Sequence, residues 1–178
     1  MSFFGQAYDP FVPYGGESPD FEQLRRVANG LAPFTQHAGV TITELDRERA
    51  VADVPGEVRL HNHVGTVHAA AQYLGAEFAA AAAFVGSAAT HIDRIEWMVV
   101  RDSRALFLRP AVGSVRATAS VDARIARTIG TLPQRHRFDI DAKAVLRDAA
   151  GSVVGKVFFD YTCQTRPAEN PSNEVTTR

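Results

Sequence analysis

Apolar and polar positions alternate on both sides of a charged centre in the run GVTITELDRERAVADV, which covers residues 39–54. A period of two residues is typical of a strand that buries one face. The charged centre, Asp46 to Arg49, is typical of a turn between two such strands. The pattern therefore predicts a β-hairpin over this segment.

An alanine-rich segment from Thr66 to about Ala89 follows the hairpin. It contains no proline, and β-branched residues do not cluster after Val67. Alanine has the highest helix propensity, so this length predicts one long helix. Small side chains nearly all the way round leave no broad polar face. We therefore expect a buried helix with sheet backbone packed close against it.

Three segments after the helix again show a period of two: residues 114–127 (SVRATASVDARIAR), 136–146 (HRFDIDAKAVL) and 153–163 (VVGKVFFDYTC). In the first of them the apolar face extends from Val115 to Ile125. The pattern predicts long strands. Residues 147–151 between the last two predict a hairpin turn, because Gly151 can adopt a positive φ angle.

Before the hairpin, Ser18-Pro19-Asp20 precedes the run FEQLRRVANG. This order predicts a short helix capped near Asp20, with Gly30 just past its end and Pro33 closing it. The complete order of elements indicates a two-layer α+β domain, with one long helix against one antiparallel sheet.

Length and composition favour one domain, since the chain has 178 residues of which 46% are hydrophobic. We expect an N-terminal extension over residues 1–17 and the folded domain over residues 18–165. The polar, proline-containing tail over residues 166–178 is predicted to be disordered. One sheet covers only one side of its helix and leaves an edge strand open, which favours a homodimer or a dimer of dimers.

Charge and hydropathy exclude some classes of partner. A formal net charge of -1 provides no general basic field for nucleic acid. The longest apolar stretch, Phe78 to Val85, is much shorter than the roughly 20 residues that cross a bilayer. The first residues lack the basic region of a secretory signal, and the single cysteine, Cys163, suits a reducing compartment. We expect a cytoplasmic protein without nucleic-acid or membrane partners.

Two motifs carry a resemblance to a known family: HNHVGTVHAAAQYLGAEFA and the later ALFLRPAVGSVRATASV. The chain resembles the hotdog-fold acyl-CoA thioesterases of the phenylacetic-acid-pathway (PaaI-like) type over roughly residues 39–164. In that family the buried helix begins with Asn, Gly, His-Gly-Gly and an acid nine positions after the His. Here Asn62, Gly65, His68 and Glu77 match these spacings.

The second motif matches the family at a strand end, a Pro-Ala pair and a glycine turn. The matching positions are Phe107, Leu108, Pro110, Ala111 and Gly113. The resemblance implies a hotdog fold, in which a five- to six-stranded antiparallel sheet wraps around the long buried helix. It also implies an acyl-CoA substrate and an active site at the subunit interface.

By the same resemblance, the backbone amide of Ala69 polarises the thioester carbonyl, and Glu77 acts as general base or nucleophile. Alternatively, Glu77 pairs with an arginine across the dimer and has no catalytic role. Asn62 either bonds the attacking water or the carbonyl, or is an ordinary turn residue. His68 either orders the preceding loop or takes part in acid-base catalysis. This chain has Ala69-Ala70 where the family usually has Gly-Gly.

Substrate binding is predicted at Gly65 and Ala70 beside the helix start. Arg109 and Arg116 could hold coenzyme A phosphates, although most arginines of this region are expected to form a solvated sheet face. Coenzyme A enters only as part of the substrate, and no other cofactor is expected. The histidines of HNHVGTVH lack further carboxylates at ligand spacing, so no metal site is predicted.

Two other functions remain open at this point. The Ala-Ala replacement fits a non-catalytic module that binds or assembles acyl ligands. So does the strand after the helix, because Glu96 to Val100 has none of the Ser or Thr residues that related enzymes use to hold water. The same fold also hosts enoyl-CoA hydratases and dehydratases, for which His61, His63 and His68 are available.

Overall fold

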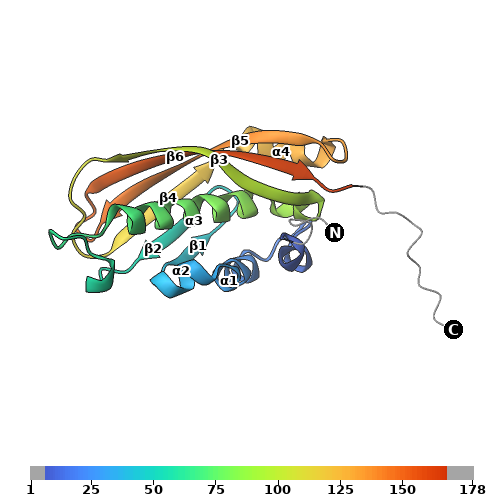
Figure 1. The fold of residues 1–178 in the computed structure, drawn as a ribbon. Helices are drawn as coiled ribbons and strands as arrows, with labels where there is room; N and C mark the ends of the chain where they lie inside the picture. The colour runs from blue at the N-terminus through green and yellow to red at the C-terminus, as the bar shows by residue number, and fades with distance from the viewer. Residues whose placement is uncertain (1–6, 168–178) are drawn as a thin grey trace.

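The computed structural model of the protein describes residues 7–167, and within them one antiparallel sheet wraps around one long helix (Figure 1). Six strands lie in the spatial order β1-β2-β4-β5-β6-β3. They are β1 (Thr41–Leu45), β2 (Ala50–Val54), β3 (Ile95–Phe107), β4 (Val115–Val121), β5 (Arg137–Asp148) and β6 (Val153–Thr165). The long helix is α3, Ala69–Ala88. The predicted α+β architecture is confirmed.

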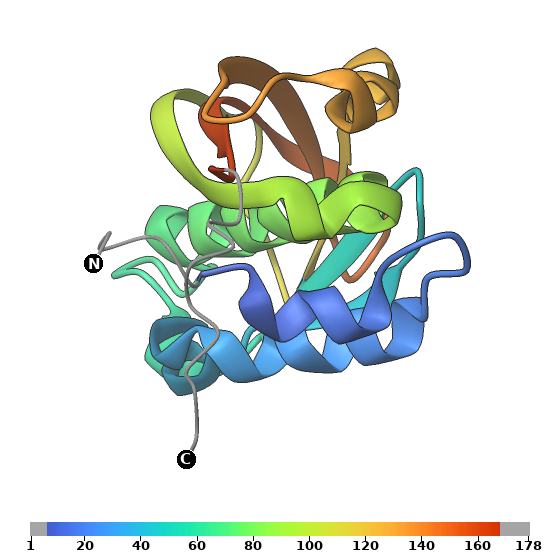
Figure 2. The same cartoon turned by 90° about the vertical axis from the view of Figure 1, so that its right-hand side faces the viewer.

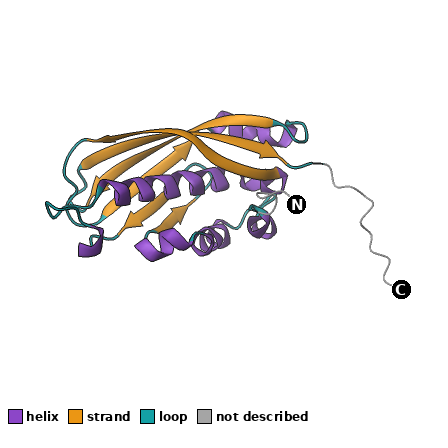
Figure 3. Cartoon of the chain, in the orientation of Figure 1, coloured by secondary structure: helices purple, strands orange, loops and turns teal. Residues whose placement is uncertain are grey.

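The remaining helices are short. They are α1 (Phe21–Leu31), α2 (Pro33–Ala38), α4 (Ala123–Thr128) and the 3-10 turns η1 (Asp9–Tyr14), η2 (Val58–Leu60), η3 (Ala89–Arg94) and η4 (Ile129–Thr131). Helices α1, α2 and α3 lie on the same side of the sheet, and the short helix α4 also contacts α3 (Figure 3). The view in Figure 2 shows α1 and α2 below α3.

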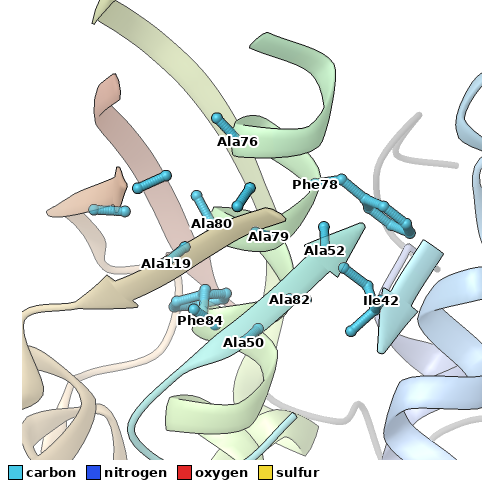
Figure 4. Close-up of a cluster of buried hydrophobic side chains, with 14 of the residues drawn as sticks. Ile42, Ala50, Ala52, Ala76, Phe78, Ala79, Ala80, Ala82, Phe84 and Ala119 are labelled. Carbon is cyan, nitrogen blue, oxygen red and sulfur yellow. The ribbon is translucent and has the colours of Figure 1, made fainter. Parts of the chain in front are cut away.

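Small side chains on α3 allow the sheet to approach closely. Alanines of the helix lie beside alanines of β2 and β4 (Figure 4): Ala79, Ala80 and Ala82 against Ala50, Ala52 and Ala119. A Cβ atom at Gly86 would lie 2.2 Å from the carbonyl oxygen of Asp46, and one at Gly75 would lie 2.3 Å from a methyl group of Val54. The close packing that the alanine-rich sequence predicts is present.

The segment before α1 belongs to the same core. Tyr8 and Phe11 are buried, and the ring of Tyr8 meets that of Phe84 edge-on, with the ring centroids 6.0 Å apart. The described part of the N-terminal extension therefore packs against α3. Of the tail predicted to be disordered, residues 168–178 lie outside the described residues.

Two helix boundaries differ from the prediction. Asp20 caps α1 as expected, its side chain accepting from the backbone N–H of Gln23. Gly30, however, lies inside α1, and Pro33 begins α2 instead of closing the helical region. Proline is compatible with the first turn of a helix, where its missing N–H would have no partner anyway.

The strand predicted to continue to Ile125 ends at Val121. Asp122 stops it, because its side chain accepts from the backbone N–H of Arg124 and caps α4. A local capping bond therefore overrides the alternating pattern. By contrast, the turn before β6 is as predicted, with Gly151 at a φ of 80°.

Candidate active site

Helix α3 begins at Ala69 because His68 caps it. The Nδ1 atom of His68 accepts from the backbone N–H of Ala70 at 3.0 Å. A ring nitrogen that accepts a hydrogen bond carries no proton, so the proton of the neutral ring is on Nε2. Among the described residues, the backbone N–H of Ala69 has no acceptor. A free donor at the positive end of the helix dipole can bind a carbonyl oxygen.

The loop before α3 is organised by the side chain of Asn62. Its Oδ1 accepts from the backbone N–H groups of Val64 and Thr66, both at 3.1 Å. Its Nδ2 donates to the hydroxyl of Thr66 at 2.9 Å. Gly65 completes the turn with a φ of 80°. Asn62 is thus a turn residue whose second Nδ2 hydrogen has no acceptor among the described residues.

Two surface pockets flank the start of α3. The first, named here the Arg109 pocket, has a volume of about 390 Å³ and is lined by Asn62, Thr66, Ala69, Gln72, Phe107 and Arg109, among others. The second, the Phe34 pocket, has a volume of about 350 Å³ and includes Phe34, Leu60, His61, His68, Ala70 and Leu74. The structure therefore brings Asn62, Ala69 and Arg109 together on one side, and His68 and Ala70 on the other.

Arg116 does not join either pocket. Its guanidinium binds the carboxylate of Asp53 on the neighbouring strand at 2.9 and 3.1 Å. This pair lines a separate pocket together with Arg147 and Asp148. The position fits the solvated sheet face that the sequence also allowed, whereas the guanidinium of Arg109 has no ion-pair partner among the described residues.

Gln72 is a polar residue of this region that the sequence prediction missed. It is buried, and its Nε2 donates to the backbone oxygen of Val67 at 2.8 Å, which ties the loop to the helix. Its Oε1 is buried without a partner among the described residues. The signal was present in the sequence, because a glutamine interrupts an otherwise apolar alanine run.

Glu77 lies eight residues after Ala69, which corresponds to about 12 Å along the helix axis. Its carboxyl group makes no hydrogen bond or ion pair among the described residues. Burial disfavours the charged form and raises the pKa of this carboxyl group above its ordinary value. The carboxylate and the free amide of one subunit are therefore too far apart to act on the same carbonyl group.

One side of α3 remains open. Ala70, Tyr73, Leu74, Glu77 and Ala81 recur at helical spacing, and none of them is fully buried. Beside this stripe, β3 forms an edge of the sheet, since it pairs only with β6. The exposed hydrophobic residues on and just after β3 are Val100, Leu106, Phe107 and Leu108.

The edge strand also supplies a hydroxyl group that the sequence prediction missed. Ser103 lies beyond the stretch Glu96 to Val100, and its Oγ is 2.8 Å from the hydroxyl oxygen of Tyr73. Tyr73 is one helical turn before Glu77 on the open stripe. Only the first half of this strand, Glu96 to Val100, therefore lacks a Ser or Thr hydroxyl group.

No group of three or more His, Cys, Asp and Glu residues within residues 7–167 is arranged to hold a metal ion. None of the helices in that range is both long and apolar enough to span a membrane.

Comparisons with known proteins identify the family. The sequence profile of DUF4442, described as a domain of unknown function, matches residues 21–162. The chain belongs to the DUF4442 family. No curated protein shows significant sequence similarity to this DUF4442 protein.

Solved structures of low sequence identity share the fold of this DUF4442 protein. PA5026 from Pseudomonas aeruginosa, described as a protein of unknown function and "probable thioesterase", is 24% identical, with a TM-score of 0.67 over 83% of this chain and 97% of its own. The thioesterase PA1618 of the same organism, solved as a mutant, is 18% identical, with a TM-score of 0.63 over 85% and 99%. The thioesterase HI1161 from Haemophilus influenzae is 15% identical, with a TM-score of 0.63 over 88% and 99%.

These likenesses confirm the predicted hotdog fold. The membership in the PaaI-like branch, which the two motifs suggested, stays a prediction.

Proposed function

We propose that the protein is an acyl-CoA thioesterase whose active site forms between two subunits. The observation that carries the proposal is the free amide of Ala69 at the start of α3 and the half-buried, unpaired carboxylate of Glu77 on the open stripe of the same helix. The amide can polarise a carbonyl group, and the carboxylate can either attack the carbonyl carbon or activate a water molecule. The thioesterases with the same fold support this reaction class.

A dimer with twofold symmetry would bring the amide of Ala69 in one subunit close to the carboxylate of Glu77 in the other. In an antiparallel pair of α3 helices, Ala69 lies opposite the partner's Glu77 when the axis passes Tyr73, the midpoint between them. Tyr73 lies on the open stripe, beside the open edge strand β3. A dimer through this face would bury the exposed apolar residues of β3 and complete two active sites together.

In such a site the thioester oxygen accepts from the N–H of Ala69. The ionised carboxylate of Glu77 then acts in one of two ways: as general base it takes a proton from a water molecule whose oxygen bonds the carbonyl carbon, or as nucleophile it bonds that carbon itself to give a mixed anhydride, which water then hydrolyses. In both routes the C–S bond breaks, the coenzyme A thiolate takes up a proton from water, and the acyl group leaves as a carboxylic acid. The apolar Phe34 pocket suits an acyl group, and the free guanidinium of Arg109 suits the anionic carrier.

The direct test measures release of free thiol from a panel of aromatic, short-chain and long-chain acyl-CoA substrates. Turnover of at least one class supports the proposal. A rise in melting temperature with these compounds, without thiol release, would instead indicate a binding module. Hydration of enoyl-CoA without thiol release would indicate a hydratase.

Mixed subunits test the interface site. One inactive variant lacks the carboxylate (Glu77→Gln), and the other lacks the amide (Ala69→Pro). When both are co-expressed in equal amounts, about half of the dimers are mixed and each has one intact site, so about one quarter of the wild-type activity is expected. Activity no higher than that of the separate variants would show that each site lies within one subunit.

The pH dependence follows from the burial of Glu77. The carboxylate must be ionised to act, and burial raises its pKa above the ordinary value near 4.5. The acid limb of the kcat/KM profile is therefore expected to lie at a higher pH than the titration of a solvated glutamate. A rate that stays constant down to pH 4 would contradict an ionised Glu77 as the reacting group.

A further inference from the structure

Helix α3 and strand β6 run side by side in the same direction, both from left to right in Figure 1. One contact sets their register: the ring centroids of Tyr73 and Phe159 are 5.5 Å apart. Four residues along a helix advance about 6 Å, and two residues along a strand advance about 6.6 Å. The next position of α3, Glu77, is therefore level with the next inward-facing residue of β6, Tyr161.

Tyr161 is the residue of β6 that faces the helix at this position. It is 1% exposed, and its ring stacks on that of Phe159 with the centroids 5.8 Å apart. Its hydroxyl oxygen is buried and makes no hydrogen bond among the described residues. A buried hydroxyl without a hydrogen bond lowers the stability of the folded protein, so buried hydroxyl groups usually have a partner.

Two buried phenols lie close enough to Glu77 to be affected by its charge. Burial raises the pKa of Tyr8 and of Tyr161, and the charge of Glu77 raises both pKa values further. The charges of Tyr73 and Cys163 also raise the pKa of Tyr161, and the charge of Asp139 raises the pKa of Cys163. Of these phenols, Tyr161 has a hydroxyl that is buried without a hydrogen-bond partner among the described residues, so it is a donor available to the carboxylate.

We propose that Tyr161 is a positioning residue for Glu77. Its hydroxyl donates to the ionised carboxylate, directly or through one buried water, and holds it toward the open face of α3. This role rests on the proposed thioesterase mechanism, in which the carboxylate of Glu77 attacks the carbonyl carbon or activates a water molecule. The bond also explains why the buried hydroxyl of Tyr161 and the half-buried carboxylate of Glu77 lie level with each other, each without another partner among the described residues.

The main test follows the titration of Glu77 itself by isotope-edited NMR of the side-chain carboxyl carbons, with Glu77→Gln assigning the signal. Loss of a donor to the charged form favours the neutral form. In Tyr161→Phe, the Glu77 titration is therefore expected to move to higher pH by about half a unit or more. An unchanged titration in a folded Tyr161→Phe protein would overturn the proposal.

This readout does not depend on catalysis, so it separates the role of Tyr161 from the thioesterase proposal. If an acyl-CoA substrate is turned over, the acid limb of kcat/KM is expected to shift together with the NMR titration. Thiol release without such a shift would overturn the role of Tyr161 alone. Failure of thiol release with a shifted titration would overturn the thioesterase mechanism and leave the contact in place.

Two comparisons guard against a purely structural effect. Tyr14→Phe removes a phenol hydroxyl from η1 and is expected to leave the Glu77 titration unchanged. Thermal unfolding of Tyr161→Phe, alone and combined with Glu77→Gln, measures whether the two side chains are coupled. If the hydroxyl has no partner, Tyr161→Phe raises the melting temperature equally in both backgrounds, and this result would contradict the proposed bond.

Discussion

Replacement of Glu77 by Gln is expected to lower kcat for acyl-CoA hydrolysis by about 10²- to 10⁴-fold, the usual contribution of a positioned acid-base group. Gln is close in shape and retains a polar end, so the packing of α3 is preserved. KM should change little, because the carboxylate acts on the reacting carbonyl and not on the carrier. Steady-state thiol release measures both constants.

The control for this variant is Glu48→Gln, which removes an exposed carboxylate from the turn of the β1-β2 hairpin. It is expected to retain wild-type activity. Full activity of Glu77→Gln would exclude the carboxylate from the mechanism and leave only amide-based catalysis.

The same variant tests the electrostatics of the site through stability. The pKa of Glu77 is raised in the folded state, so its contribution to stability is fully present below the unfolded pKa and is lost as the pH rises through the folded pKa. At pH 7, Glu77→Gln is therefore expected to unfold at an equal or higher temperature than the wild type, with a smaller difference near pH 4. A variant that is clearly less stable at pH 7 would indicate a positively charged partner for the carboxylate, such as an arginine across the dimer.

Replacement of Ala69 by Pro is expected to lower kcat by about 10²- to 10³-fold, as for the loss of one oxyanion donor. Ala69 is the first residue of α3, where proline is well tolerated. His68 before it has φ −58° and ψ 141°, a conformation that a following proline favours. The substitution therefore removes one N–H group and leaves the helix start in place.

Ala69→Gly provides the matched comparison, since it shortens the side chain but keeps the amide. It also restores the glycine that the PaaI-like thioesterases usually have at this position, and its kcat should equal or exceed that of the wild type. Circular dichroism and thermal unfolding show whether the proline variant keeps its fold. Unchanged turnover in Ala69→Pro would mean that another donor polarises the carbonyl.

Local sequence patterns were sufficient for most of the elements. The alanine run specified α3, and the alternation specified the hairpin and the strands β4, β5 and β6, because both depend on which side chains face the core. The alternation did not predict β3. The same rule was wrong where two local signals competed. At Asp122 a side-chain cap ends β4, although the apolar alternation continues to Ile125.

The candidate site was only partly readable. Asn62, Gly65, His68 and Glu77 could be found by spacing, because they lie close together along the chain around the start of one helix. Arg109 lies in the same pocket as Asn62 only because the chain returns to the start of α3 after β3. Arg116 looked similar in sequence, yet its pairing partner Asp53 comes from a strand far away in the chain. The alternating pattern of a strand does not indicate which pocket an arginine side chain faces.

The sequence by itself determined a long buried helix and the carboxylate within it, since these depend on residues within a few turns of one another. The tertiary structure decided which groups meet. It placed β3 at the edge beside β6, left one stripe of α3 open, and set Tyr161 level with Glu77. Strand order and helix-to-sheet register arise from packing between segments distant in sequence, and a single-chain pattern does not encode such contacts locally.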